Sequence, residues 1–456
     1  MTLFMTPSGE VGGGRQATPP ATRGPGHITP ARRQIRKILV FAVLITAVGC
    51  STYTSKMEIS RDFYYAGEYE QAIGSLTALI KDASDNDVCL YLLERGKTRL
   101  AYGDYDSAIV DFQEAEKRVH EIEGTFSVSE FIKTSIVSAG KMEYQPEAHE
   151  KILINAYLLL AYQMKGDFEG AKVERNRTVA RLKQYTDRLS EENLDKLDVP
   201  FARYLAALLY EMDGLADDAR IEYDGVAKLR PEARPAVENP NLTEVVVFAE
   251  MGRAPLKISR EVKGYFNDTD GNLFGFFTLP GAAEPMMVSG GAVSGLSMKN
   301  SGVGFSFAFP EYVRQPRIAS YCRVVIDSME AATATVLDNV EETAMESFKK
   351  RIGTILLKAA LRTYLRTLAQ TKLEDKAGGL INILGKFYSA VETADTRSWQ
   401  TLPAEIGVFR MECAPGEHEV FLNYYGDGGA PAGCSRRVRF TVGEGKKEII
   451  YFPGPS

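Results

Sequence analysis

Two short stretches carry residue types that hydrolytic enzymes use. His149-Glu150 begins the HExxH pattern of zinc peptidases, in which two histidines one helical turn apart bind the metal. Leu153 stands where the second histidine belongs. The stretch GFSFA at 304–308 has Ala308 in place of the final glycine of the GxSxG nucleophile turn, and its phenylalanines are typical of a strand. Neither stretch therefore predicts a catalytic site.

The sequence offers little to a metal ion or a phosphate group. NDTDGN at 267–272 has the composition of a calcium loop, but Phe266 and Phe277 occupy the positions of the first and last carboxylate ligands, so a tight turn is predicted instead. The chain contains no GxxxxGK[ST] motif. The histidines beyond the leader are scattered, at His120, His149 and His418. We therefore expect no cofactor and no enzyme activity; a hydrolase assembled from distant side chains is the alternative.

One cysteine has a chemical role that its position predicts. An apolar run of twelve residues, ILVFAVLITAVG at 38–49, stops at Cys50 and follows the basic stretch RRQIRK at 32–37. A run of this length forms a helix of about 18 Å, whereas a bilayer core needs about twenty apolar residues. A basic stretch, a short apolar run and small residues are the order of an export signal peptide. We predict cleavage before Cys50.

The end of this run, Ala47-Val48-Gly49-Cys50, resembles the bacterial lipobox, with Ala47 where leucine is more frequent. The resemblance implies that Cys50 is acylated, as with palmitate, and becomes the mature N-terminus. Each buried methylene of an acyl chain contributes on the order of 0.8 kcal/mol, so several chains anchor a protein without a membrane span. An unmodified cysteine after an ordinary signal peptide is the alternative. Ser51 follows instead of aspartate, which favours the periplasmic face of the outer membrane.

Residues 1–31 form a leader rich in Gly, Pro and Thr that cannot bury a core. We assign 1–49 to this leader and the signal peptide, and 50–57 to a lipidated tether. Two explanations of the leader stay open. Either the true start codon lies downstream, which we favour, or RRQIRK resembles a twin-arginine export signal.

The mature chain is acidic. The full sequence has 54 Lys and Arg and 60 Asp and Glu, and without residues 1–49 these numbers are 48 and 59. The resulting net charge of −11 argues against nucleic acid as a partner. Residues 51–240 hold 24 basic and 35 acidic side chains, whereas 241–456 hold 24 of each. This difference predicts two domains of unlike character.

Four cysteines follow Cys50. Cys413 and Cys434 flank a predicted hairpin region and could form a disulfide in an oxidising compartment. Cys89 and Cys322 have no evident partner. Four reduced, mostly buried thiols are the alternative.

A short phrase recurs in the first half of the chain. It appears as AGEYEQAI at 66–73, YGDYDSAI at 102–109, KGDFEGAK at 165–172 and, more loosely, DGLADDAR at 213–220. A glycine ends one helix, an acidic residue starts the next, an aromatic side chain wedges between them and an alanine allows close approach. The expected turn glycines are Gly67, Gly103, Gly166 and Gly214; the wedges are Tyr69, Tyr105 and Phe168; the contact alanines are Ala72, Ala108, Ala171 and Ala219.

The phrase resembles the tetratricopeptide repeat, most closely in RLAYGDYDSAIVDFQEAEKR at 99–118. The first two turn glycines are 36 residues apart, close to the family period of about 34, whereas the later gaps are 63 and 48. We therefore predict an irregular TPR-like helical repeat domain over 58–235. The resemblance implies recognition of peptides or partner proteins on the inner face of the array. The alternative is that the helices only support the second half.

The second half alternates between strand and helix patterns. A proline-rich stretch at 230–241 precedes TEVVVFAEMG at 243–252, the first predicted strand. Gly- and Phe-rich segments and the alternating apolar residues near the C-terminus favour further strands. We predict a β-sandwich-like domain over 241–456 with a helical insertion at about 330–394. Within the insertion, a basic and strongly apolar helical hairpin over 348–390 would either lie on a membrane or pack on the rest of the protein.

Two segments resemble a poorly characterised family of proteobacterial lipoproteins: PEAHEKILINAYLLLAYQMKGDFEGAKVERNR at 146–177 and ADTRSWQTLPAEIGVFRMECAPGEHEVFL at 394–422. The resemblance implies no enzyme activity and no established site residues. In the second segment we expect Asp395 and Arg397 to pair locally and Trp399 to be an apolar anchor.

These observations together predict an α+β lipoprotein that is anchored through Cys50 in the cell envelope. We expect its repeats to bind envelope proteins or peptides, as a scaffold or regulator of envelope assembly. A second hypothesis places a peptidoglycan-binding or glycan-binding or hydrolysing module in 241–456. A third makes the 348–390 hairpin a membrane-active element.

Overall fold

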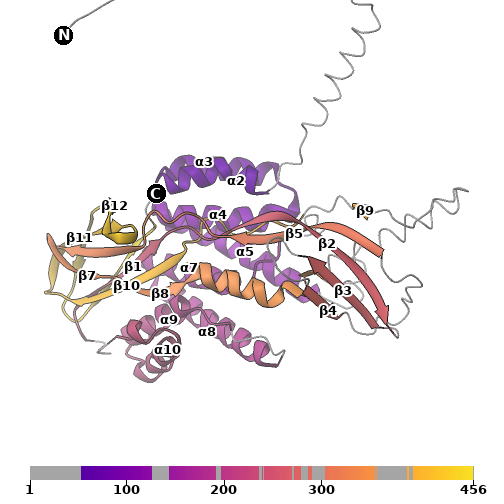
Figure 1. Cartoon of the computed structure of the whole chain (residues 1–456). Helices are drawn as coiled ribbons and strands as arrows, with labels where there is room; N and C mark the ends of the chain where they lie inside the picture. Colours follow the sequence, from indigo (N-terminus) through magenta and orange to yellow (C-terminus); the bar gives the residue numbers. More distant parts are fainter. Residues whose placement is uncertain are drawn as a thin grey trace, which may run out of the picture. The chain divides into compact units, whose positions relative to one another are not determined.

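Helices fill the first half of the chain and strands most of the second half (Figure 1). The computed structural model describes residues 53–125, 143–191, 197–235, 239, 241–269, 272–278, 286–289, 303–353, 355–356, 388–389 and 394–454. The helices are α2 (Tyr53–Tyr65), α3 (Tyr69–Asp82), α4 (Asp85–Tyr102), α5 (Tyr105–Thr125), α7 (Ala148–Lys165), α8 (Phe168–Glu191), α9 (Pro200–Met212) and α10 (Ala216–Leu229), and a further helix covers 340–353. The strands are β1 (Glu244–Met251), β2 (Leu256–Thr269), β3 (Asn272–Thr278), β4 (Met286–Ser289), β5 (Val303–Val313), β6 (Tyr321–Ile326), β7 (Met329–Thr333), β8 (Thr335–Asn339), β9 (Tyr388–Ser389), β10 (Glu405–Glu412), β11 (Gly416–Tyr425), β12 (Pro431–Cys434), β13 (Val438–Val442) and β14 (Lys447–Phe452).

Four helical hairpins, α2–α3, α4–α5, α7–α8 and α9–α10, are closed by the same turn. The turn glycines have positive φ angles of 74°, 97°, 80° and 74° at Gly67, Gly103, Gly166 and Gly214. The residue after each glycine donates its N–H to the carbonyl five residues earlier, as Asp104 does to Arg99 at 2.9 Å. Glycine reaches this left-handed conformation without a steric penalty, and the turn satisfies carbonyls at the end of the first helix. The predicted turns are therefore confirmed at all four positions.

The second helix of each hairpin begins largely as the repeated phrase predicts. Asp104 and Asp167 each accept an N–H three residues later, from Ser107 at 3.3 Å and from Gly170 at 3.0 Å. Glu68 makes no such bond within the described part of the chain. The contact alanines are all at most 1% exposed: Ala72, Ala108, Ala171 and Ala219.

The predicted aromatic wedge is wrong at Phe168, which is 56% exposed. The ring of Tyr162, from α7, lies so close to Gly170 that a Cβ there would stand 2.4 Å from it. Tyr162 therefore fills the space between α7 and α8 that the repeat pattern assigns to Phe168. Tyr69 and Tyr105 are half-buried.

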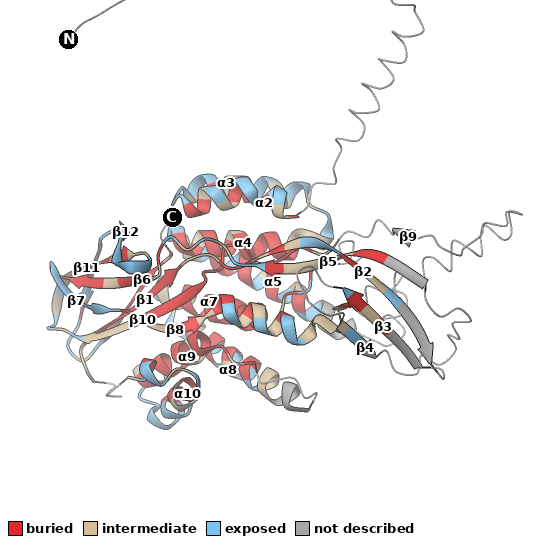
Figure 2. Cartoon of the chain, in the orientation of Figure 1, coloured by how far each residue is buried: buried red, intermediate tan, exposed pale blue. Residues whose placement is uncertain are grey.

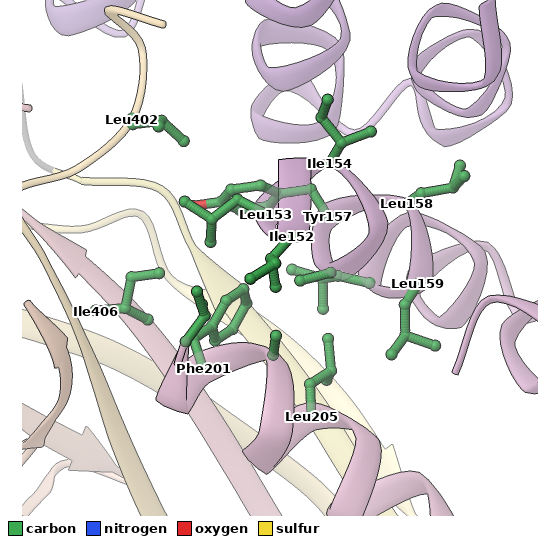
Figure 3. Packing of buried hydrophobic residues seen from close by; sticks show 14 of the residues in the cluster. Ile152, Leu153, Ile154, Tyr157, Leu158, Leu159, Phe201, Leu205, Leu402 and Ile406 are labelled. Atoms are coloured by element: carbon green, nitrogen blue, oxygen red, sulfur yellow. The ribbon is translucent and has the colours of Figure 1, made fainter. Parts of the chain in front are cut away.

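In the last three hairpins, the first helix is the more deeply buried, as Figure 2 shows for α9 beside α10. Helix α7 is buried almost continuously from His149 to Ala161, so it is covered around its circumference and not only on one stripe. Figure 3 shows side chains of α7 and α9 packed with Leu402 and Ile406, which come from the C-terminal half.

The strands form three sheets. The order is β14-β1-β10-β8 in the first, β12-β11-β6-β7 with β13 beside β11 in the second, and β4-β3-β2-β5-β9 in the third. In the first sheet, β1 is parallel to β14 and antiparallel to β10, and β10 is antiparallel to β8 with an irregularity between Ile406 and Gly407.

The first sheet lies between the helices and the second sheet, so the entire length of β1 is buried. Val246 and Phe248 pack in the core that the helices form, whereas Val245 and Val247 pack against the second sheet. Successive residues of a strand point to opposite faces, which explains why this strand has no polar side. Because the helices and the first sheet share one core, Thr52–Ser456 forms one compact unit. The boundary at 235–241 separates two kinds of secondary structure and not two cores.

The third sheet packs on the helix over 340–353 in a smaller core. Phe307 and Phe309 of β5 lie there with Val262 and Phe277, and the helix contributes Phe348.

The helical insertion expected at about 330–394 begins ten residues later than predicted. Residues 329–339 form β7 and β8, because Asp327 and Ser328 take positive φ angles of 48° and 68° and reverse the chain in a two-residue hairpin turn. The helix starts after Asn339, whose side chain accepts the N–H of Glu342 at 2.9 Å. Residues 388–389 form strand β9, which pairs with β5, so the prediction of a helix at these two residues is wrong as well. Residues 357–387 of the expected hairpin lie outside the described residues.

One further expectation needs correction. Helix α2 includes residues 53–57, which the sequence assigns to the tether, because Tyr53 and Met57 are buried in the helical core. Of the two alternatives for the cysteines, the structure has the free thiols at all four described positions, with Cys89 and Cys322 buried and Cys434 exposed. Cys413 follows a strand of the first sheet and Cys434 ends a strand of the second. No helix in the described ranges is both long enough and apolar enough to cross a membrane.

Candidate functional site

The helices hold an irregular segment of the same chain, residues 394–403, on the side formed by α2, α4 and α7. All residues from Thr396 to Leu402 are buried, although the segment belongs to neither a helix nor a strand. This part of the helical surface is therefore covered by the chain itself.

Glu94 of α4 is the first side chain that holds the segment. Its Oε1 accepts the backbone N–H of Gln400 at 2.7 Å and the hydroxyl of Tyr53 at 2.8 Å, and its Oε2 accepts the N–H of Thr401 at 2.9 Å. Glu94 is fully buried, and this burial raises its pKa to about 7.

Glu150 of α7 holds the preceding residue. Its Oε1 accepts the backbone N–H of Trp399 at 2.9 Å, and its Oε2 accepts the hydroxyl of Tyr144 at 2.5 Å. The indole of Trp399 is 1% exposed and lies 6.1 Å from the ring of Phe112 and 5.8 Å from that of Tyr157. The prediction of Trp399 as an apolar anchor is confirmed, and its partners are helical residues almost 250 positions away.

Arg397 completes the attachment. It pairs with Asp395 at 2.8 Å, as predicted, and also with Asp87 of α4 at 3.0 Å. The hydroxyl of Tyr65 donates to the carbonyl of Gln400 at 2.9 Å. The helices therefore bind this segment chiefly through its backbone, with two buried carboxylates accepting three successive N–H groups.

A buried lysine joins the helices to the first sheet. Lys97 of α4 donates to Glu250 of β1 at 2.7 Å, to the hydroxyl of Tyr451 at 2.7 Å and to that of Tyr64 at 3.1 Å. Its ammonium lies 4.8 Å from the centre of the Tyr157 ring, and its side chain is fully buried. Burial lowers the pKa of Lys97, which Glu250 opposes. This ion pair was not predictable from the sequence, because its members are 153 residues apart.

The motifs that suggested catalysis have structural roles. His149 is buried, and burial lowers its pKa to about 4, while Glu150 is engaged with the segment at 394–403. Ser306, in the GFSFA stretch, lies in β5 and donates to Glu261 of the neighbouring strand at 2.6 Å. His418 bonds to Asp327 at 2.7 Å. The described residues contain no group of His, Cys, Asp and Glu that could hold a metal ion.

An open cleft of about 620 Å³ lies between α5 and α8, with α7 as its floor. Its size is in the range of ligand sites, but its lining is polar. The lining includes Gln113, Glu116, Lys117, His120 and Glu121 of α5, Asn155 of α7, and Arg177, Ala180, Arg181 and Gln184 of α8.

Glu116 is the charged centre of this cleft. Asn155 donates to it at 2.5 Å, while three cationic or titratable groups surround it at longer distances: Arg181 at 3.8 Å, Arg177 at 3.9 Å and His120 at 4.0 Å. Arg177 also pairs with Glu174 at 2.8 Å, and burial together with the nearby Glu116 raises the pKa of Glu174 to about 7. The sequence did not single out this cluster, because polar residues at helical spacing ordinarily mark a solvated face.

No family model matches the chain, and no curated protein matches it. The resemblance to a lipoprotein family therefore stays a prediction.

Proposed function

We propose that this protein is a non-enzymatic, lipid-anchored envelope protein whose TPR-like helices bind other envelope proteins, as a scaffold or regulator of envelope assembly. Acyl chains on Cys50 would hold it at the membrane. The two sheets that share the second core would form a β-sandwich-like support for the helices.

The observation that carries this proposal is the binding of residues 394–403 by α4 and α7. Glu94 and Glu150 accept three successive backbone N–H groups, so buried carboxylates of the helical half bind a chain segment through its backbone. The other side of the helices is open to solvent. On this side, the second helix of each of the last three hairpins exposes an apolar side chain two residues after its contact alanine. These side chains are Val110, Val173 and Ile221, which are 62%, 51% and 60% exposed, respectively.

Site-specific photo-crosslinking in intact cells tests partner binding. A photoreactive amino acid is placed at Val110, Val173 or Ile221 on the helices, and at Met329 on β7 as the matched control, because Met329 is 72% exposed but lies on the second sheet. We expect discrete adducts with envelope proteins from the helix positions and none from Met329. Adducts of equal yield at all four positions, or none at any, would contradict the proposal.

The anchor is tested separately by the variant Cys50→Ala. If Cys50 carries the acyl chains, the variant leaves the membrane fraction and lacks the metabolically incorporated palmitate label that the native protein carries. Membrane association that persists unchanged in the variant would refute lipidation at Cys50. The variant Cys434→Ala is the control, since Cys434 is an exposed free thiol far along the chain.

Peptidoglycan or glycan binding is the competing function. Sedimentation of the whole mature protein with purified peptidoglycan distinguishes the two, because the shared core argues against testing residues 241–456 alone. Under our proposal the protein stays in the supernatant.

A further inference from the structure

The first sheet is one strand short along part of β10. This strand pairs with β1 along its whole length. On its other side, β8 pairs only with residues 405–408. Strand β7, which precedes β8 in the chain, pairs with β6 in the second sheet instead. Residues 409–412, the open stretch of β10, therefore have no strand beside them on this side within the described part of the chain.

The backbone of the open stretch presents polar groups on this side. In an antiparallel pair, the N–H and C=O groups of successive residues face opposite sides of the strand. Cys413 donates its N–H to the carbonyl of Thr243 at 3.1 Å, so the odd-numbered residues of β10 face β1. The N–H and C=O groups of Arg410 and Glu412 consequently face away from β1, where none of the described strands pairs with them.

The exposure of β10 changes where β8 ends. Residues 405–408 are buried, whereas 409–411 are half-buried and Glu412 is exposed. The side chain of Arg410 is held on the face towards the helices, by Glu211 at 2.7 Å and Glu244 at 2.6 Å. These ion pairs and the pairing with β1 fix the open stretch as a strand before any partner binds.

A cleft of about 370 Å³ lies along this edge. Its lining includes Val408, Phe409 and Arg410 of β10, Ala332 and Thr333 of β7, Thr335 of β8, and residues 232–235 after α10. Val408 packs in the core that the helices form, whereas Phe409 packs against the core between the two sheets. Successive side chains of a strand point to opposite faces, so a cleft lined by both residues lies at the edge of the strand.

An open strand edge is a site for another strand. Natural proteins usually cover such edges, because their free N–H and C=O groups pair readily with a second chain. In this mode of recognition, backbone hydrogen bonds supply affinity and alternate side chains supply specificity. The open stretch has four residues, which corresponds to about 13 Å of strand.

The charges at this edge favour a basic partner. Glu232, in the cleft lining, and Glu412 are both exposed, and the side chains of both lack an ion pair or hydrogen bond to the described residues. The cations nearby are already engaged, since Arg234 pairs with Asp224 and Arg410 with two glutamates. Opposite charges on neighbouring strands stabilise their pairing, so a Lys or Arg side chain fits beside these carboxylates.

Beyond the partner binding proposed for the helices, we infer that the open stretch of β10 is a second interaction surface, at which a partner protein adds a β-strand. The added strand runs antiparallel to β10, because it takes the line that β8 leaves free. It carries Lys or Arg on the face of Glu412 and apolar side chains on the face of Phe409.

The test uses the mature protein and a fluorescein-labelled hexapeptide that alternates lysine and valine, with binding measured by fluorescence anisotropy at about 150 mM salt. Two further peptides carry backbone N-methyl groups, one on its lysines and the other on its valines. In an antiparallel pair, a residue that exchanges hydrogen bonds with Glu412 also shares its face. The lysines therefore direct their N–H groups to β10, and the valines direct theirs away.

We expect the valine-methylated peptide to bind as the unmodified one does, and the lysine-methylated peptide to bind about tenfold or more weakly. Equal binding of the two methylated peptides would show that no strand is added. Weaker binding of the valine-methylated peptide alone would contradict the antiparallel arrangement. Either result overturns the inference.

Matched protein variants locate the site. The edge variant combines Glu232→Gln and Glu412→Gln; the control combines Glu70→Gln and Glu121→Gln, which are also exposed, change the net charge equally and lie outside the cleft lining. The unmodified peptide should bind the edge variant about threefold or more weakly than the native protein and the control. Equal weakening in both variants would mean unspecific attraction to an acidic protein and would overturn the inference.

A second copy of the chain is the competing occupant of this edge. Sedimentation velocity of the native protein distinguishes the two cases. We expect a monomer with and without the peptide. A dimer that the peptide converts to monomers would show that the edge pairs with another copy, and the inference would be wrong.

The inference and the proposed function fail separately. Peptide binding at the edge without crosslinks from the helix positions would refute the proposed function alone. Crosslinks from the helix positions without peptide binding would refute the second surface alone. Met329 remains a valid crosslinking control, because it lies at the opposite end of β7 from Thr333 and outside the cleft lining.

Discussion

Replacing the buried lysine by methionine is the most direct test of how the helices and sheets are joined. Lys97→Met keeps an unbranched chain of similar length but removes the ammonium that donates to Glu250 at 2.7 Å. Glu250 is 1% exposed, so its charge stays buried with the hydroxyls of Tyr157, at 2.6 Å, and Tyr451 as its partners. Removing one partner of a buried ion pair costs about 3–5 kcal/mol, because the other charge is left uncompensated.

Urea unfolding measures this loss. Far-UV circular dichroism follows the helices, and the emission of Trp399, the single tryptophan of the chain, follows the segment at 394–403. A loss of about 3–5 kcal/mol raises the unfolding constant by roughly two to three and a half powers of ten. Both probes should change at the same urea concentration, because the lysine, the segment and the first sheet belong to one core.

Two further variants test whether the unpaired charge of Glu250 causes this loss of stability. Lys97→Met combined with Glu250→Gln removes both charges and should recover most of the lost stability, since the cost arises from the unpaired carboxylate. Lys172→Met makes the same substitution in the exposed pair with Glu169 and should cost no more than about 0.5 kcal/mol. A Lys97→Met loss below about 1 kcal/mol, or a double variant less stable than the single one, would show that the ion pair does not hold the two halves together.

Three other outcomes follow from the structure. Trp399→Ala should destabilise the fold by about 3–5 kcal/mol, measured by circular dichroism because the variant has no tryptophan. Gly103→Ala should lower the free energy of unfolding by about 1–2 kcal/mol, because φ is 97° at this position. Gly74→Ala should raise it by about 0.5–1 kcal/mol, because Gly74 lies within α3 and its Cβ position is open. Equal effects of the two variants in thermal unfolding would contradict the turn argument. The hydrogen bond to Asp327 raises the pKa of His418. The stability that protonated His418 contributes is therefore fully present below about pH 6.5 and is lost as the pH rises through the folded-state pKa. The free energy of unfolding of His418→Asn, measured between pH 5 and 8, should lack this pH dependence.

The local features of the helices were predictable, because they depend on residues close in sequence. The glycine turns and the contact alanines follow from the repeated phrase alone. Phe168 was mispredicted because a neighbouring helix supplies Tyr162 to the same space, which the phrase cannot contain. Strands β7 and β8 were mistaken for helix because the turn Asp327-Ser328 lacks the glycine of the Asn-Gly and Asp-Gly pairs that mark a two-residue hairpin most strongly.

The buried contacts that hold the protein together were not predictable from the sequence. Trp399 was expected to be an anchor, but its attachment to Glu150 joins positions 249 residues apart. The candidate cleft was missed for another reason: Glu116, Arg177 and Arg181 each look like ordinary surface residues, and only the wide spacing of α5 and α8 around Asn155 gives them a common space.

The contact between Lys97 and Tyr451 joins the first helices to the last strand of the chain. These residues are 354 positions apart, and the segment at 394–403 likewise reaches the helices from the C-terminal half. When the N-terminal helices have been synthesised, Glu94, Lys97 and Glu150 already have Tyr53, Tyr64 and Tyr144 as partners within the helical half. Their remaining partners, Glu250, Tyr451 and residues 399–401, arrive only with the C-terminal half. A chain truncated before residue 394 should therefore be less stable in its helices than the native chain, because these buried charges lose part of their hydrogen bonds.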